Sequence, residues 1–271
     1  MKTEDKKVIL ITGVSSGIGA VCADLLAKSG YIVYGTSRKI RESQSLFEVL
    51  KMDVTSEESI QNVVQYIVGK EKKIDILINN AGIGIAGPLE NCSMEEIQMQ
   101  FDVNFFGVVR MCKAVIPIMK ARQEGTIINV SSLGGILGMP FQAYYTATKF
   151  AIEGFSETMH MELKRFRIKT ILIEPGDIKT NFTDNRIIAK DAQGNDPDLI
   201  AFKNALDVIV KDETHGADPK MVAKLMLKII TKKNPALRYP ATSFEQGLVP
   251  VLRRILPYFL FEKIIASHYQ V

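Results

Sequence analysis

The stretch Thr12-Gly13-Val14-Ser15-Ser16-Gly17-Ile18-Gly19 decides the fold. It directly follows the apolar run of residues 8–11 and opens a helix-like segment, residues 20–28, that Gly30 can terminate. Glycines at a strand-to-helix turn let the backbone approach a pyrophosphate closely, and the helix N-terminus offers unpaired N–H groups and a partial positive charge. The position of these glycines therefore predicts a dinucleotide-binding turn, although three glycines alone would also fit a turn that binds nothing.

Further short apolar runs, rich in β-branched residues, lie at 32–34, 74–78, 126–130 and 170–173, with amphipathic stretches between most of them. Alternating strands and helices indicate a parallel sheet with right-handed crossovers and helices on both faces. We predict an α/β fold: a Rossmann-type doubly wound parallel sheet of about seven strands, forming a single domain over residues 1–271. The crossover between residues 38 and 48 leaves room for a short helix or none.

Composition excludes several classes of function. The formal charge of +4 is modest, and the aromatic residues are not interleaved with basic runs, so we expect no nucleic-acid partner. Three distant cysteines and three scattered histidines predict neither a disulfide framework nor a metal site. The N-terminus lacks the apolar core of a secretory signal, and no apolar run reaches the roughly 20 residues of a spanning helix. We expect a cytoplasmic protein, with membrane contact at most peripheral.

Several ordered motifs follow the first turn. Asn79-Asn80-Ala81-Gly82 ends the fourth strand, Tyr145 and Lys149 form a Y-x-x-x-K pattern, and Pro175-Gly176 ends the sixth strand. Together with the glycine spacing 13–17–19, which is similar to T-G-x-x-x-G-x-G, they make residues 6 to 182 resemble the short-chain dehydrogenase/reductase family. The resemblance implies an oxidoreductase that binds a nicotinamide dinucleotide and forms a homodimer or homotetramer through the helices around Asn104 and Tyr145.

The same resemblance implies the catalytic residues. Tyr145 and Lys149 are four apart, so on a helix they share a face, and nearby positive charge favours the phenolate form of a tyrosine whose pKa is otherwise near 10. The family serine lies thirteen positions before the tyrosine, at Ser132, and we prefer it to Ser131 because neighbouring strand residues point to opposite sides. Asn104 resembles the family asparagine that holds a water linking Lys149 to solvent. Tyr145 is then the general acid/base.

The end of the second strand, Ser37-Arg38, suggests which cofactor is bound. An acid there would bond the ribose 2′-hydroxyl of NAD, whereas an arginine can bond the 2′-phosphate of NADP. We therefore predict NADP(H) rather than NAD(H). The predicted cofactor contacts are Gly13, Ser15, Ser16, Gly17, Ile18, Gly19, Ser37, Arg38, Asp53, Val54, Asn80, Ala81, Gly82, Tyr145, Lys149, Pro175, Gly176 and Thr180.

Apolar residues after Ser132 and Gly176 predict a hydrophobic ketone or secondary alcohol as substrate; they include Leu137, Met139, Phe141, Phe182, Ile187 and Ile188. The stretches 131–141 and 145–154 resemble the hydroxysteroid and retinol dehydrogenase branch, and long-chain keto-lipid reductases share these features, so steroid, retinoid and keto-lipid substrates stay open. Two other functions also stay open. One is a sugar-nucleotide epimerase-like enzyme, and the other is a catalytically silent NADPH-binding scaffold or sensor.

The C-terminal third carries two further features. Residues 183–216 are polar, are interrupted around 194–197, and are predicted to form a substrate lid. The tail, about 244–271, combines apolar bulk with Arg253 and Arg254, a composition found in interfacial helices, although Pro250 and Pro257 should break it up. The tail can contact a membrane surface, cover the substrate cleft or pack against a second subunit.

Overall fold

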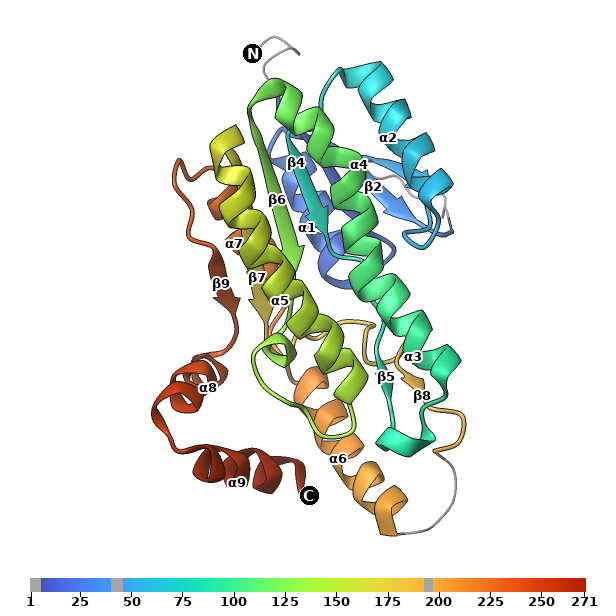
Figure 1. Ribbon diagram of the computed structural model, residues 1–271, viewed down its shortest axis with the longest axis vertical. Coiled ribbons are helices and arrows are strands. Elements are labelled where there is room, and N and C mark those ends of the chain that lie inside the picture. The colour runs from blue at the N-terminus through green and yellow to red at the C-terminus, as the bar shows by residue number, and fades with distance from the viewer. Residues whose placement is uncertain (1–5, 40–45, 193–196) are drawn as a thin grey trace.

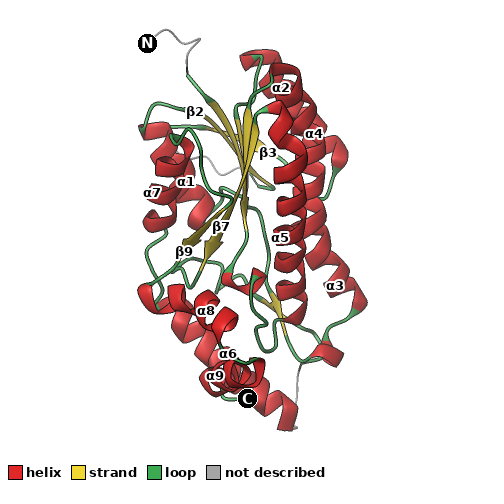
Figure 2. Ribbon diagram, turned by 60° about the vertical axis from the view of Figure 1, so that its left-hand side comes forward, coloured by secondary structure: helices red, strands yellow, loops and turns green. Residues whose placement is uncertain are grey.

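The computed structural model describes residues 6–39, 46–192 and 197–271. Seven parallel strands form one sheet in the order β3-β2-β1-β4-β6-β7-β9. Helices cover both faces of this sheet, with α1 and α7 on one side and α2, α4 and α5 on the other (Figure 2). The doubly wound α/β fold predicted from the sequence is confirmed, and so is its number of strands.

The strands of the sheet are β1 (Val8–Thr12), β2 (Ile32–Ser37), β3 (Glu48–Lys51), β4 (Ile76–Asn79), β6 (Gly125–Val130), β7 (Ile168–Pro175) and β9 (Arg238–Ala241), while β5 (Ile85–Ala86) and β8 (Ile187–Ile188) pair separately. The helices, labelled in Figure 1, are α1 (Gly17–Lys28), α2 (Glu57–Glu71), α3 (Met94–Phe101), α4 (Gly107–Arg122), α5 (Ala143–Leu163), α6 (Pro197–Thr214), α7 (Lys220–Ile230), α8 (Phe244–Ile255) and α9 (Tyr258–Tyr269). A π-helical turn, η3 (Asp102–Phe106), and a 3₁₀ turn, η4 (Leu133–Gly135), lie beside the site described below.

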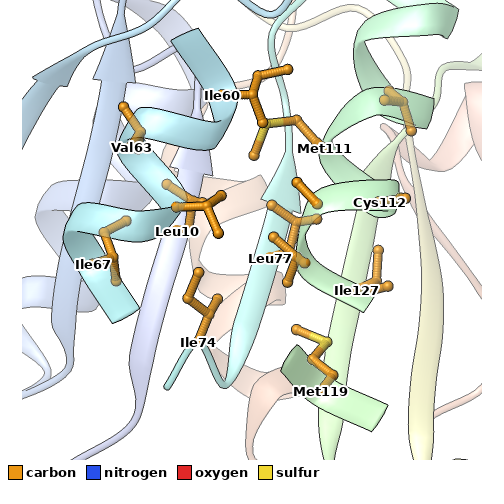
Figure 3. Close-up of a cluster of buried hydrophobic side chains, with 14 of the residues drawn as sticks. Leu10, Ile60, Val63, Ile67, Ile74, Leu77, Met111, Cys112, Met119 and Ile127 are labelled. Atoms are coloured by element: carbon orange, nitrogen blue, oxygen red, sulfur yellow. The ribbon is translucent and has the colours of Figure 1, made fainter. Parts of the chain in front are cut away.

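The central strands are apolar throughout because both of their faces are buried. Along β1, Leu10 packs with α2 and α4, whereas Ile9 and Ile11 pack with α1 and α7. Figure 3 shows the first of these clusters, where Leu10 and Leu77 lie beneath the side chains of α2 and α4. Continuous apolar strands are therefore the pattern of a sheet with helices on both faces.

The structure departs from the sequence-based expectations at the two edges of the sheet. Strands β3 and β9 were not predicted, because both are short and carry charged residues, as edge strands commonly do. Pro240 is tolerated in β9 because this strand pairs on one side only, with β7. The crossover expected between residues 38 and 48 lies partly outside the described residues, since 40–45 are not described.

The C-terminal third also differs. Residues 193–196 lie outside the described part of the chain, but the rest of the predicted polar lid contains the long helix α6. Pro250 does not interrupt the tail, since α8 continues through it, whereas Pro257 separates α8 from α9 as expected. No helix in the described ranges is long and apolar enough to cross a membrane.

Gly19 gives a direct test of how tightly the first turn is packed. A Cβ at this position would collide with the Gly13 carbonyl oxygen and with Nδ2 of Asn80, both of which are held in place. We expect Gly19→Ala to lower the free energy of unfolding in urea by about 1–3 kcal/mol. The matched control is Gly69→Ala in α2, where nothing lies within 4 Å, and it should be stabilising by up to about 1 kcal/mol. Equal effects of the two substitutions would contradict this packing argument.

Candidate active site

A cleft of about 1140 Å³ lies at the carboxyl ends of the parallel strands. Its walls come from the segments that follow β1, β2, β3, β4, β6 and β7, together with parts of α5, α6, α8 and α9. Every site residue predicted from the sequence borders this cleft except Gly19 and Asn104. The structure therefore brings the predicted cofactor and catalytic residues into one continuous site.

The turn after β1 is shaped to bind an anion. Gly13 and Gly17 have φ angles of 74° and 61°, a left-handed conformation that glycine adopts without strain. The side-chain amide of Asn80 donates to the carbonyl oxygens of Thr12 and Gly13 at 3.0 Å, and this fixes the turn against the end of β4. Ser16 is the N-cap residue of α1, but its side chain makes no capping hydrogen bond, and the first turn of the helix contains no acidic residue. Free N–H groups at this end therefore fit a dinucleotide pyrophosphate.

The far end of the cleft carries the residues predicted to hold the adenosine. Arg38 is exposed just after β2, where Ser37 takes the position at which an acid would bond a ribose hydroxyl. Asp53 follows β3 and accepts hydrogen bonds from the backbone N–H and the hydroxyl of Thr55, at 2.9 and 2.8 Å. Among the described residues, the tip of β2 therefore carries the Arg38 guanidinium and no acid.

Ser132, Tyr145 and Lys149 meet between η4 and α5. The Lys149 ammonium donates to the Val130 carbonyl oxygen at 2.9 Å and lies 5.6 Å from the centre of the Tyr145 ring. The Ser132 hydroxyl accepts from the Gly134 N–H at 3.1 Å and lies close enough to the Tyr145 phenol to lower its pKa. Ser131 is buried instead against Gly135: a Cβ added to Gly135 would lie 2.5 Å from the Ser131 hydroxyl oxygen. Of the two serines, Ser132 is the one that meets Tyr145.

Burial controls the ionisation of both α5 residues. It raises the pKa of Tyr145 to about 12, and the hydrogen bond with Ser132 acts in the opposite direction. Burial lowers the pKa of Lys149 to about 8, with the Glu153 carboxylate opposing it. The sequence suggested that positive charge near Tyr145 would favour the phenolate, but in this enclosed position loss of solvation dominates. At neutral pH the phenol is therefore protonated and the amine largely charged, which suits a proton donor beside a cation.

Asn104 lies in the π-helical turn η3, where it is 1% exposed. Its side-chain oxygen accepts from the Ile83 N–H at 2.8 Å, and its amide donates to the Ile83 carbonyl oxygen at 2.9 Å and to the Thr148 hydroxyl at 3.2 Å. This amide joins the chain after β4 to α5, behind the wall of the cleft. It supports the site without bordering it.

The predicted apolar wall is present in part. Leu137, Met139, Phe182 and Ile187 border the cleft, with the Phe182 ring 5.9 Å from that of Tyr145. Phe141 instead packs against Phe202 on α6, at 5.4 Å between ring centres, and Ile188 is not part of the wall. Phe141 was wrongly placed because an apolar side chain in a loop can turn either way. Ile188 was wrongly placed because it alternates with Ile187 along β8 and so points away from the cleft.

Sequence reasoning missed a polar group of residues at this end of the cleft, namely Gln142, Asp177, Asp212, Glu213, Gln246 and His268. Asp177 could have been noticed, since it directly follows Pro175-Gly176 at a strand end. The residues of α6, α8 and α9 carry no such signal, because tertiary packing alone brings those helices over the cleft.

Comparison with known proteins agrees with this geometry. Residues 7–191 match the family model described as short chain dehydrogenase. The chain therefore belongs to the short-chain dehydrogenase/reductase family of oxidoreductases, whose members bind NAD(P) nucleotides. The family resemblance seen in the sequence is confirmed.

Individual relatives point to the expected branch. The chain is 42% identical over 265 residues to a 3-ketodihydrosphingosine reductase from Bacteroides thetaiotaomicron, covering 98% of each chain. It is 38% identical to retinol dehydrogenase 8 from Bos taurus, covering 86% of this chain and 80% of that protein. Among solved structures, a short-chain dehydrogenase from Streptomyces avermitilis superimposes with a TM-score of 0.81 at 27% identity, covering 98% of this chain and 99% of the other.

Proposed function

We propose that this protein is an NADP(H)-dependent oxidoreductase that interconverts a hydrophobic ketone and a secondary alcohol. The observation that carries the proposal is the meeting of Ser132, Tyr145 and Lys149 beside the glycine turn in one cleft. A steroid, a retinoid or a long-chain keto-lipid fits the apolar side chains of Leu137, Met139 and Phe182. The relatives named as a 3-ketodihydrosphingosine reductase and a retinol dehydrogenase support these classes of substrate.

In the reductive direction each side chain has a separate task. NADPH, when bound, supplies a hydride for the carbonyl carbon. Tyr145 donates its phenolic proton to the carbonyl oxygen, and its raised pKa keeps that proton in place until the oxygen becomes basic. Ser132 hydrogen-bonds the same oxygen, and the positive charge of Lys149 stabilises the phenolate that remains. The family resemblance implies a water that links Lys149 to Asn104 in a proton path to solvent, whereas the bonds of the Asn104 side chain to Ile83 and Thr148 hold the chain after β4 against α5.

Two parts of the chain complete the proposed architecture. The lid, residues 183–216, borders the cleft through Ile187, Asp212 and Glu213, and the tail, residues 244–271, borders it through Gln246 and His268. Both therefore help to select the substrate.

Replacing Tyr145 with Phe tests the proton donor. We expect reduction of a ketone with NADPH to slow by about 10²–10⁴-fold while NADPH affinity is kept, because only the acid is lost. Tyr144→Phe is the matched control, since that hydroxyl bonds the Leu89 carbonyl oxygen at the surface, and its turnover should be unchanged. Stopped-flow oxidation of NADPH measures both variants. Undiminished turnover in Tyr145→Phe would remove the proposed acid, and NADPH binding without turnover on any ketone would favour the scaffold instead.

The cofactor preference depends on Arg38. We propose that its guanidinium bonds the 2′-phosphate of NADP(H) beside Ser37, a charge-assisted contact that NAD(H) cannot offer. Arg38→Ala should weaken NADPH binding by about tenfold or more and leave NADH binding almost unchanged, as measured by fluorescence titration. An unaltered protein that prefers NADH, or a variant that loses both dinucleotides equally, would contradict this assignment.

We also propose that the tail contacts an anionic membrane surface peripherally. Phe244, Ile255 and Tyr258 are 84%, 67% and 73% exposed, and Arg253 and Arg254 are exposed beside them. Large apolar side chains with neighbouring cations are typical of helices that lie in a membrane interface. The competing use of this surface is self-association, since the family resemblance implies a dimer or tetramer through the helices around Asn104 and Tyr145. The tail reaches the second of these helices, because the Arg253 guanidinium lies 5.4 Å from the ring centre of Phe150 on α5.

Phe244→Ser combined with Tyr258→Ser should reduce co-sedimentation with phosphatidylglycerol vesicles by roughly fivefold or more, since apolar area available for insertion is lost. Leu89→Ser is the control, because Leu89 is 60% exposed on a different part of the molecule and should not affect vesicle binding. Equal partitioning of all three proteins would end the membrane proposal. Sedimentation without vesicles gives the oligomeric state and shows whether the double variant changes it.

A further inference from the structure

One arginine and two buried carboxyl groups meet between α5 and the last two strands of the sheet. Glu153 lies on α5, Glu174 on β7 and Arg238 at the start of β9, and none of the three borders the cleft. The Nε of Arg238 donates to Glu153 at 3.0 Å and lies 3.3 Å from a Glu174 oxygen. The side chains of Glu153 and Glu174 are 7% and 6% exposed, so little solvent reaches either carboxyl.

This cluster holds more negative than positive charge. The Nε of an arginine carries one hydrogen, which Glu153 accepts, and the nearby Glu174 oxygen receives no hydrogen bond within the described structure. The Nη2 of Arg238 pairs with Glu157 at 2.6 Å, but that carboxylate is half-exposed and therefore solvated. Burial and repulsion from Glu153 raise the pKa of Glu174 to about 7. Glu174 is therefore the carboxyl that takes up a proton below neutral pH.

Glu153 keeps its charge because its neighbours favour the carboxylate. Burial raises the pKa of Glu153 as well, and Glu157 acts in the same direction, but Ser131 and Arg238 oppose this shift. The Ser131 hydroxyl is buried against Gly135, and a Cβ added to that glycine would also lie 3.2 Å from the Cγ of Glu153. Ser131 thus serves the carboxylate of Glu153, whereas Ser132 serves the cleft.

The charge of Glu153 acts on the catalytic amine. Glu153 follows Lys149 by four residues, so the two side chains share one face of α5. Tyr145, also on α5, places its ring centre 5.6 Å from the ammonium, and β6 contributes the neutral carbonyl oxygen of Val130. Burial lowers the pKa of Lys149, and the Glu153 carboxylate is the charged group that opposes this effect.

We propose that Glu153 is a positioning residue that keeps Lys149 charged, and that Arg238 and the protonated Glu174 hold Glu153 in place for this task. The inference deepens the proposed function and rests on it. A neutral amine at position 149 would leave the Tyr145 phenolate, which forms as the substrate is reduced, without a neighbouring cation. Because Arg238 belongs to β9, the edge of the sheet takes part in setting the protonation of the site.

The pH dependence of ketone reduction tests this role. With NADPH and androstanedione, kcat/KM should fall as the pH rises through the pKa of Lys149, about 8, because the charged amine is lost. Glu153→Gln keeps the shape and removes the charge, so this fall should move down by about one pH unit or more. Glu174→Gln replaces one neutral group with another and is the matched control, together with Glu157→Gln on the same guanidinium. Both controls should move the fall by less than about 0.3 pH unit.

Arg238→Met is a second route to the same result if Glu153→Gln folds poorly. Loss of the guanidinium removes a group that lowers the pKa of Glu153, so the carboxyl should take up a proton and the fall should again move to lower pH. A fall that stays in place in both variants, or that moves equally in Glu153→Gln and Glu174→Gln, would overturn the inference.

A measurement without turnover separates this inference from the proposed function. NMR of protein labelled with ¹³C at the lysine Cε follows the titration of Lys149, whose signal is assigned by its loss in Lys149→Met. The pKa of Lys149 should be lower in Glu153→Gln than in the unaltered protein and in Glu174→Gln. If no ketone is reduced but this order holds, the proposed function fails and the role of Glu153 stands. The same pKa of Lys149 in all three proteins would contradict it.

Discussion

The close contact between the turn after β1 and the chain after β4 determines the rest of the site. An added Cβ on Gly13 would lie 2.8 Å from the Cα of Ala81, so a side chain there would push the two segments apart. Asn80 and the Thr12 hydroxyl tie these segments together through hydrogen bonds of 3.0 Å. Because β1 and β4 are adjacent and parallel, this contact aims the N-terminus of α1 and the end of β4 into the same cleft.

The site also requires that the Lys149 ammonium and the Tyr145 phenol be held where little solvent reaches them. Lys149 is 6% exposed and Tyr145 is 9% exposed. Burial lowers the pKa of Lys149 and raises the pKa of Tyr145, and both shifts favour the neutral form of the side chain. Val130 compensates by accepting a hydrogen bond from the ammonium, and Glu153, one turn further along α5, opposes the shift of Lys149. Secondary structure thus fixes both the spacing of the two side chains and the surroundings that set their protonation.

The sequence predicted the parts of the molecule whose position depends on local pattern. Strands β1, β4 and β6 were found because burial on both faces makes them apolar, and the cleft residues were found because motif spacing places them at strand ends. Strand β9 escaped prediction since it is short and half-buried. The pairing of Gln246 with Asp177 joins residues 69 apart in the chain, and no local pattern encodes such a contact. Tertiary packing, which brings α6, α8 and α9 over the cleft, supplied the polar residues that sequence reasoning missed.

The arrangement of α9 and the loop before it suggests how an amphiphilic substrate would lie. Asp177 lies close enough to Tyr145 to act on its phenol. A shallower hollow shares Ile264 and His268 with the main cleft and is lined by Leu256, Leu260, Lys263, Ile264, Ser267 and His268. Under the proposed function, a long-chain substrate whose carbonyl lies at Tyr145 would extend its alkyl chain toward this hollow. Since Leu260 and Ile264 are 40% and 48% exposed, the chain would reach the surface at the helices proposed to meet the membrane. The reacting carbonyl and the proposed membrane contact would then lie at the two ends of one path, with the apolar side chains of Leu256, Leu260 and Ile264 along it.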